Sequence, residues 1–191
     1  MNLKNKLAIF DLDGTLFDTK DVNYNAYQNA IKMTGIGIII DYNDFCNLYN
    51  GKNYRDFLPK IIPNISEEQM KNIHNLKKDI YINYLDKAKK NNLLFAIIQE
   101  MKKSFFISIV TNASKKNVDD ILEKFCVKDL FDLLITQEDI ENPKPSAEGF
   151  LKVMDYFNIS KENTIIFEDS EIGIQAAVKS GADYVKVYGY N

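Results

Sequence analysis

The sequence predicts an α/β fold, a Rossmann-like three-layer core around a parallel sheet with an inserted α-helical cap. Short apolar runs, typical of strands buried on both faces, recur at residues 7–10, 105–110, 133–135, 164–167 and 184–187. Segments with helical periodicity separate the later runs, and strands that alternate with helices indicate a parallel sheet. Residues 17–92 interrupt this alternation, because they carry helical patterns and no convincing strand.

Three helices are predicted between the later strands, at residues 114–125, 146–157 and 170–180. Each begins at a serine whose hydroxyl can cap the first turn, namely Ser114, Ser146 and Ser170. Gly181 follows the last of these segments, where a glycine can adopt the left-handed conformation that ends a helix.

The interruption after the first strand predicts a helical insertion. We expect residues 1–16 and 93–191 to form the core and residues 17–92 to form the cap. The clearest helical pattern spans residues 66–89, where apolar residues recur at helical spacing. The run "IGIII" at residues 36–40 is rich in β-formers but lies between helical patterns, so we expect an apolar connection packed inside the insertion.

Composition narrows the class of protein. A chain of 191 residues that is 46% hydrophobic can fill one core with an inserted lobe, but hardly two independent domains. The net charge of -3, with lysines scattered among acidic residues, gives no basic face for nucleic acid. Cys46 and Cys126 are far apart, which fits a reducing compartment. Without an export or membrane-spanning pattern, we expect a cytoplasmic monomer or weak dimer.

Polar residues follow the predicted strands in the segments "FDLDGT", "IVTN", "NPKPS" and "IFEDS". Ligands of parallel α/β sheets bind at the carboxyl ends of the strands. We therefore expect one crevice to contain Asp11, Asp13, Thr111, Lys144, Glu168 and Asp169. The two neighbouring carboxylates of the first segment would repel each other, which calls for a cation between them.

Each of these residues also has a purely structural interpretation. The "DLDG" segment could be a turn, and Thr111 could be an ordinary strand or cap residue. Lys144 could be a solvated loop lysine, and the acidic pair at residues 168–169 could cap the following helix. The combination favours a site, because four independent coincidences would have to fall at the same edge of the sheet.

These segments resemble the signature of the haloacid dehalogenase superfamily of phosphotransferases. That superfamily has DxDGT after the first strand, a Thr or Ser after the second, a Lys before the third helix and an acidic pair after the fourth strand. The present chain has "DLDGT", "VTN", "NPKPS" and "FEDSEIG" in that order. The insertion after the first strand is similar to the superfamily's helical cap. Ala147 stands where many relatives have a proline, which affects no catalytic position.

The resemblance implies a Mg²⁺ cofactor, since Mg²⁺ prefers hard oxygen ligands and would offset the repulsion between carboxylates. Its ligands would be the carboxylates of Asp11 and Asp169, the main-chain carbonyl of Asp13 and, directly or indirectly, Glu168. The implied reaction is transfer of a phosphoryl group to the protein and then to water.

The resemblance also implies a role for each polar residue. Asp11 would attack phosphorus and form an aspartyl-phosphate, while Asp13 would protonate the leaving oxygen and then activate water. Thr111, Asn112 and Lys144 would bind the phosphoryl oxygens. Dehalogenases of the superfamily lack the second aspartate, so we expect phosphate chemistry.

The segment "FEDSEIGIQAAVKSGA" resembles the branch that contains β-phosphoglucomutase and small sugar-phosphate phosphatases. Mutases of that branch carry a histidine early in the cap, where this chain has Asn23. We therefore expect a phosphatase of a small phosphorylated metabolite, a sugar phosphate or an organic-acid phosphate, with a mutase as the alternative. A phospho-aspartate signalling domain or a silent binding relative is a remote alternative, because the cap and the complete set of motif residues argue against both.

Two further features concern the cap. The single histidine, His74, lies beside "NLKKD" and is expected to face solvent, which argues against a Ser-His-Asp triad or a histidine zinc site. In "YNGKNYRDFLPKI", Lys52 and Arg55 are predicted to share one helical face. The branch resembles this chain in having a cap arginine shortly after a glycine, here Gly51, so Arg55 and less strongly Lys52 are predicted to determine substrate specificity.

Overall fold

The computed structural model describes residues 4–189 and divides into two compact units. The first unit contains the chain up to Asp18 and from Lys89 onward, and the second unit is Thr19–Ala88. The sequence placed the corresponding boundaries after residue 16 and before residue 93.

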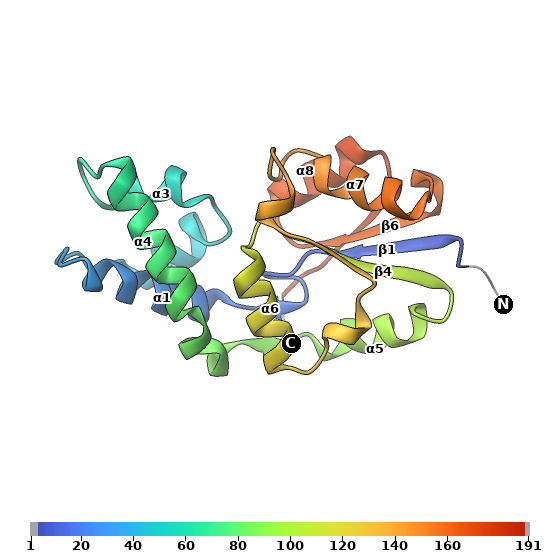
Figure 1. Cartoon of the computed structure of the whole chain (residues 1–191), viewed down its shortest axis with the longest axis horizontal. Coiled ribbons are helices and arrows are strands. Elements are labelled where there is room, and N and C mark those ends of the chain that lie inside the picture. The colour runs from blue at the N-terminus through green and yellow to red at the C-terminus, as the bar shows by residue number, and fades with distance from the viewer. Residues whose placement is uncertain (1–3, 190–191) are drawn as a thin grey trace. The chain divides into compact units, whose positions relative to one another are not determined.

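The first unit is built on a five-stranded sheet of order β5-β4-β1-β6-β7, in which every neighbouring pair is parallel. Its strands are β1 (Lys6–Phe10), β4 (Phe105–Val110), β5 (Leu133–Ile135), β6 (Thr164–Glu168) and β7 (Asp183–Lys186). Figure 1 shows β1 between β4 and β6. The predicted α/β class and all five predicted strands are confirmed.

Burial along the strands follows their place in the sheet. The four residues 7–10 of the central strand β1 have no exposed surface, which explains their uninterrupted apolar run. All residues of β7 are exposed and those of β5 are half-buried. The prediction that every strand is buried on both faces is therefore wrong for these two strands, because each lies at an edge of the sheet with only one neighbouring strand.

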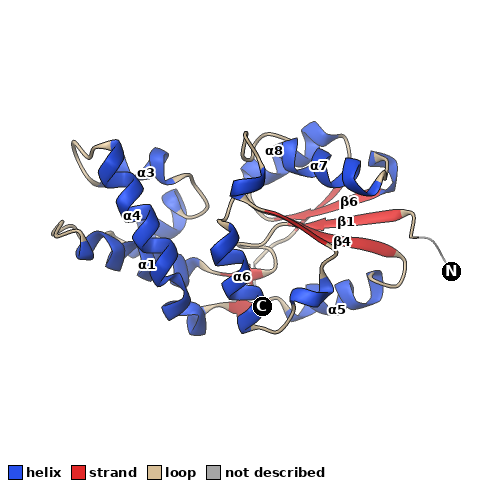
Figure 2. Ribbon diagram, in the orientation of Figure 1, coloured by secondary structure: helices blue, strands red, loops and turns tan. Residues whose placement is uncertain are grey.

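Helices cover both faces of this sheet. They are α5 (Asn92–Met101), α6 (Lys115–Lys124), α7 (Glu148–Phe157) and α8 (Glu171–Ser180). Right-handed crossovers in this strand order place α5 and α6 on one face and α7 and α8 on the other, and Figure 2 shows α5 opposite α7 and α8. Short 3₁₀ turns occupy Lys128–Leu130, Gln137–Asp139 and Lys161–Asn163. The sequence predicted the last three helices but not α5.

Two of the three predicted serines occupy the cap position itself. Ser114 accepts a hydrogen bond from Asn117 N, and Ser170 accepts one from Gly173 N, at the starts of α6 and α8. The third serine lies one residue earlier relative to its helix than predicted, because Ala147 occupies the cap position of α7, but the Ser146 hydroxyl still accepts from Glu148 N, the first residue of the helix, at 3.2 Å. Gly181 ends α8 with φ +77°, as predicted.

The second unit contains helices only. They are α1 (Lys20–Met33), α2 (Tyr42–Asp44), α3 (Tyr54–Ile61) and α4 (Glu67–Ile80), with a π turn at Phe45–Tyr49 and a 3₁₀ helix at Tyr81–Lys87. Ser66 and Gln69 form a capping box at the start of α4, so the pattern predicted over residues 66–89 divides into α4 and the 3₁₀ helix. A cluster of buried aromatic and aliphatic side chains, with Tyr27 and Phe57 edge to face at 4.9 Å, forms the core of this unit.

Residues 36–40 have no regular secondary structure, as predicted for an apolar connection. Ile40 is buried, and Ile36 and Ile38 pack against the hydrophobic cluster of the second unit. Ile39 is 83% exposed, so the packing of this connection is partial.

A two-residue strand at each end of the insertion was not predicted. β2 (Phe17–Asp18) pairs antiparallel with β3 (Lys89–Lys90), with Phe17 opposite Lys90 and Asp18 opposite Lys89. The prediction that residues 17–92 contain no strand is wrong at these ends, because a strand of two residues is too short to show a period of two. Their pairing accounts for the position of the unit boundaries.

His74 is half-buried between aromatic rings, so the prediction that it faces solvent is wrong. Its ring stacks on Tyr54 at 4.1 Å, and its Nδ1 lies 3.2 Å from the hydroxyl of Tyr27. Burial, together with the charge of Lys77 and other nearby cations, lowers the pKa of His74 to about 3, so the ring is neutral at neutral pH. Its aromatic partners come from α1 and α3. The sequence around His74 could not reveal its burial, because contacts between different helices leave no pattern in the local sequence. Among residues 4–189, no helix is both long and apolar enough to cross a membrane.

Candidate active site

Three neighbouring strands deliver polar residues to one edge of the sheet. Asp11 follows β1, and its main-chain N–H donates to Phe167 O at 2.9 Å. Thr111 follows β4, and its N–H donates to Ile135 O at 3.0 Å. Glu168 is the last residue of β6. Because all three strands are parallel and adjacent, their carboxyl ends meet at the same place.

Lys144 reaches this edge from the loop before α7. Its Nζ donates to Asp11 Oδ1 at 2.7 Å, to Glu168 Oε1 at 2.6 Å and to Val110 O at 2.7 Å. An ammonium has three N–H donors, and these acceptors use all of them. Lys144 is 7% exposed, so its interpretation as a solvated loop lysine is wrong.

The low exposure of this cluster shifts its titration. Burial lowers the pKa of Lys144, but the Asp11 and Glu168 carboxylates outweigh burial and raise it above the ordinary value. Burial raises the pKa of Asp11 well above its usual range, against the influence of Lys144, and Glu168 and Asp169 raise it further. Burial and the neighbouring Glu168 raise the pKa of Asp169 from 3.8 to about 6. The carboxylates thus have more negative charge than one ammonium offsets.

The composition of the cluster fits a divalent cation. Asp11, Glu168 and Asp169 each offer a carboxylate oxygen, and these atoms lie within 4.8 Å of one another. Hard oxygen donors around an excess of negative charge suit Mg²⁺. Asp13 is half-buried in the turn after β1, where it makes a bridge with Phe17.

Glu168 is completely buried and is held at both carboxylate oxygens. Oε1 accepts from Lys144, while Oε2 accepts from the main-chain N–H groups of Asp169 and Ser170 at 3.0 and 3.1 Å and from the Ser170 hydroxyl at 3.1 Å. Both N–H groups precede α8, whose cap is Ser170, so Glu168 does not cap the helix directly but holds the loop that leads into it. The same side chain also holds the ammonium.

Two glycines leave room for the acidic pair. Gly14 has φ +96°, and a Cβ there would lie 2.1 Å from Asp169 Oδ2. A Cβ at Gly173 would lie 1.8 Å from Glu168 Oε1. Both distances are far below van der Waals contact, so these positions require glycine if the carboxylates are to stay in place.

Thr15 and Ser170 both contact the acidic pair, although the sequence predicted neither of them as a site residue. Thr15 is completely buried, and its hydroxyl donates to Asp169 Oδ1 at 3.0 Å. Thr15 is the last residue of the DxDGT pattern, so the pattern itself pointed to this position. Ser170 was expected only as a helix cap, which its contact with Glu168 supplements.

Thr111 and Asn112 differ in what their side chains contact. The Thr111 hydroxyl accepts from Ala113 N at 3.1 Å, which leaves its own O–H proton available for another acceptor. Asn112 was expected to bind phosphate, but its side-chain amide is bonded to the main chain of Lys144. A phosphate contact of Asn112 would therefore involve its main-chain N–H.

The two cations predicted to determine specificity lie in the second unit. The helix α3 begins at Tyr54, so Lys52 precedes it, and the prediction that both cations share a helical face is wrong. Arg55 Nε donates to Glu67 Oε1 at 3.0 Å, and its guanidinium lies 4.8 Å from the Tyr54 ring centroid. Both members of the Arg55–Glu67 ion pair are exposed.

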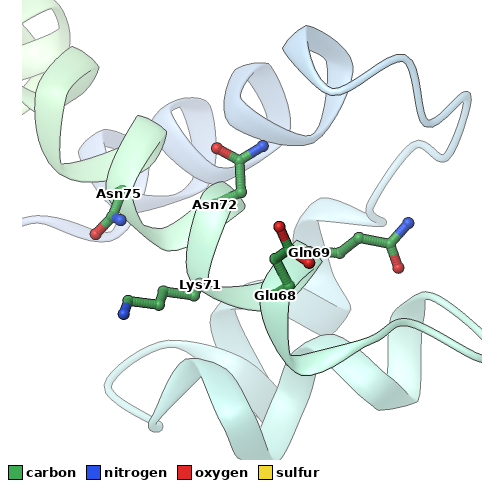
Figure 3. A pocket seen from close by; sticks show the side chains of 5 residues that line it. All are labelled: Glu68, Gln69, Lys71, Asn72 and Asn75. Carbon is green, nitrogen blue, oxygen red and sulfur yellow. The ribbon is translucent and has the colours of Figure 1, made fainter.

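A hollow on α4 is a separate feature of the second unit. Figure 3 shows the polar side chains that line it, which are Glu68, Gln69, Lys71, Asn72 and Asn75. All five come from one helix, and sequence analysis had singled out none of them. They contain no cluster of carboxylates comparable to that of the first unit.

Comparisons with known proteins agree with this architecture. A family model described as "Haloacid dehalogenase-like hydrolase" matches residues 8–187. The chain therefore belongs to the haloacid dehalogenase-like hydrolases, and the predicted family and the prediction of an enzyme are confirmed.

Individual relatives are distant but extend along most of the chain. The phosphorylated carbohydrates phosphatase of Thermotoga maritima is 26% identical over 95% of this chain and 83% of its own length. A β-phosphoglucomutase from Clostridium difficile is 26% identical with a TM-score of 0.80, covering 97% of this chain and 85% of that one. CbbY from Rhodobacter sphaeroides in complex with phosphate has a TM-score of 0.86 over 97% of this chain and 87% of that one; at 18% identity it shows the fold alone.

The raised pKa of Asp169 predicts a pH dependence for the binding of a divalent cation to the carboxylate cluster. Because the folded-state pKa of about 6 exceeds the ordinary 3.8, folding takes up a proton in this interval. The stability that the protein gains from this bound proton is fully present below about pH 4 and is lost as the pH rises through about 6. A cation can replace the proton only where the carboxylates are ionised. We expect Mg²⁺ to raise the melting temperature more at pH 8 than at pH 5.

The measurement is a thermal melt with and without MgCl₂ at the two pH values, with NaCl of equal ionic strength as the control. Equal increases at both pH values would contradict binding of Mg²⁺ to this carboxylate cluster.

Proposed function

We propose that the protein is a Mg²⁺-dependent phosphatase that hydrolyses a small phosphorylated metabolite through an aspartyl-phosphate intermediate. The observation that carries the proposal is the Lys144 ammonium bonded to both Asp11 and Glu168 at the carboxyl edge of a parallel sheet. That arrangement places one positive charge beside a buried nucleophile and next to a carboxylate cluster that suits a divalent cation. The named phosphatases among its relatives support the same class of reaction.

In the proposed reaction, an Asp11 carboxylate oxygen attacks phosphorus, a bond forms between them, and the bond from phosphorus to the ester oxygen breaks. Asp13 donates a proton to the leaving oxygen. Asp13 then takes a proton from water as the water oxygen attacks phosphorus, which releases phosphate and restores Asp11. The roles of Asp11 and Asp13 are supported by their places in the family pattern.

The phosphoryl oxygens carry negative charge throughout these steps. The Lys144 ammonium and the available hydroxyl proton of Thr111 are suited to stabilise that charge. Asp11, Asp169 and the main-chain carbonyl of Asp13 would hold Mg²⁺, which when bound offsets the charge of the carboxylates and phosphate. Glu168 has both oxygens bonded to protein donors, which favours holding Lys144 and Asp169 in place over direct binding of the metal.

We propose a sugar phosphate or an organic-acid phosphate as the substrate, with Arg55 binding a distal anionic group. The similarity to a phosphatase of phosphorylated carbohydrates supports the first class. A β-phosphoglucomutase-like mutase is the second candidate, since one such enzyme is 26% identical. Asn23 favours the phosphatase, because its amide, which donates to Thr19 Oγ1 at 3.2 Å, cannot exchange a proton as a histidine does.

The direct test is hydrolysis of p-nitrophenyl phosphate and of a panel of phosphorylated sugars and organic acids. We expect turnover that requires Mg²⁺ and is abolished by EDTA, because the carboxylate cluster needs a cation before it can accept a phosphate dianion. The same panel, analysed for isomerised sugar phosphates, separates a phosphatase from a mutase. Turnover that persists in EDTA would contradict the assignment of the metal.

Replacing Asp11 and replacing Asp13 are expected to block different steps of the reaction. Asp11→Asn should abolish phosphoenzyme formation, because an amide is too poor a nucleophile. Asp13→Asn should still form phosphoenzyme from an activated aryl phosphate whose leaving group needs no proton, but should slow its breakdown roughly 10²-fold or more. Acid-quenched mass spectrometry measures the yield in each variant. Equal phosphoenzyme yields from both variants would mean that these roles are assigned wrongly.

Arg55→Ala should lower kcat/KM for the natural substrate roughly 10- to 100-fold, because a guanidinium binds a carboxylate or phosphate through paired hydrogen bonds. Hydrolysis of p-nitrophenyl phosphate, which has no distal anion, should be unchanged. Lys60→Ala removes another exposed cation from α3 and is the matched control. An equal loss on both substrates would indicate a general defect, and no loss on either would leave Arg55 as surface charge.

A further inference from the structure

The loop that carries Lys144 has unusually few main-chain donors. Lys144 lies between Pro143 and Pro145, and proline has no N–H, so the N–H of Lys144 is the single main-chain donor of these three residues. A buried main-chain N–H or C=O group without a hydrogen-bond partner destabilises the fold. The partners of the Lys144 main chain therefore indicate what holds this loop in place.

Both main-chain groups of Lys144 are bonded to one side chain. Asn112 Oδ1 accepts from Lys144 N at 3.0 Å, and Asn112 Nδ2 donates to Lys144 O at 3.3 Å. The two residues are 32 positions apart in the sequence, so this is a tertiary contact between the end of β4 and the loop before α7. An amide suits this contact, because it offers both an acceptor for the Lys144 N–H and a donor for the Lys144 C=O.

Other contacts hold the loop on either side but not at Lys144. Glu148, on α7, accepts from the main-chain N–H groups of Glu141 and Asn142, both at 2.9 Å. On the other side, Lys179 Nζ donates to Pro145 O at 2.8 Å. A turn in which Ser146 N donates to Pro143 O at 3.0 Å encloses Lys144 but does not use its N–H or C=O. The bonds described for those two groups are the ones to Asn112, which tie the turn to the end of β4.

Asn112 also directly follows Thr111, whose main chain is bonded to Ile135 O at 3.0 Å on the neighbouring strand. The two hydrogen bonds between Asn112 and Lys144, which we call the clamp, thus connect a residue adjacent to Thr111, which the sheet holds in place, to a lysine with a long flexible side chain. We propose that Asn112 is a positioning residue, whose amide fixes the Lys144 main chain relative to Thr111 and so sets the Lys144 ammonium beside Asp11. This role rests on the proposed phosphatase function and belongs to the Asn112 side chain, whereas the predicted binding of phosphate is left to its main-chain N–H.

The test compares Asn112→Ala with Asn142→Ala. Asn142 lies in the same loop and is exposed, and its side chain donates to Glu148 rather than to Lys144, so it is a matched control. The first measurement is hydrogen exchange of the Lys144 amide by NMR, which needs no activity. Asn112→Ala should accelerate this exchange at least about tenfold while amides of α8 are unchanged, and Asn142→Ala should leave it unchanged.

The second measurement is kcat/KM for p-nitrophenyl phosphate. Asn112→Ala should lower it roughly 10- to 100-fold. In a Lys144→Ala background, assayed at high enzyme concentration, the same change should cost less than about threefold, because the ammonium that Asn112 positions is already absent. Asn112→Asp, which keeps the acceptor for Lys144 N–H but not the donor, should accelerate exchange less than Asn112→Ala and is the second variant if the alanine variant fails to fold.

Unchanged exchange at Lys144 in Asn112→Ala would overturn the clamp. Faster exchange with wild-type kcat/KM would overturn its catalytic role, and an equal loss of activity with and without Lys144 would show that Asn112 acts on another group. If the wild-type protein hydrolyses no phosphomonoester, the proposed function fails, whereas the exchange measurement still decides whether Asn112 holds the loop.

Discussion

The polar chemistry of this protein depends on one buried ammonium. Lys144 is bonded to Asp11 and Glu168 at distances of 2.7 and 2.6 Å and is shielded from water. Removing one partner from a buried ion pair typically costs about 3 to 5 kcal/mol, because the remaining charge has lost its partner in a medium of low polarity. The surrounding structure is therefore constrained to keep all three groups together. Strand order, loop contacts and glycine positions each contribute to that constraint.

The constraint extends to residues without charge. The Asp169 carboxylate is held between Thr15, which donates a hydrogen bond, and Gly14, whose missing Cβ leaves it room. Glu168 is similarly placed against Gly173. Segments from both ends of the chain thus shape the same acidic pair. A substitution at one of these small residues would act on the charge cluster by displacing a carboxylate, although the residue itself has no role in proton or phosphoryl transfer.

Much of this arrangement could be predicted from sequence because it depends on local patterns. The strands are apolar runs, and polar residues that end adjacent parallel strands must meet, so the proximity of Asp11 and Glu168 was predictable. Contacts between distant elements left no such pattern. The aromatic partners of His74 and the contact between Asn112 and Lys144 depend on packing, and the two-residue strands are too short for periodicity. Lys52 was misplaced because the start of α3 is set by the cap residue Asn53, one position beyond it.

The pairing of β2 with β3 has a consequence for how such a protein can change. Asp18 and Lys89 are opposite each other, so the chain leaves the first unit and returns to it at neighbouring positions. For the sheet and its charge cluster, the whole helical insertion is equivalent to a surface loop closed by a short ladder. The free-energy cost of closing a loop, which comes from lost chain entropy, increases by only about 0.6 kcal/mol for each doubling of its length. Insertions of different size and sequence can therefore occupy this position at little cost to the sheet and its charge cluster, so the helical unit can change in evolution independently of the buried ammonium and its carboxylates.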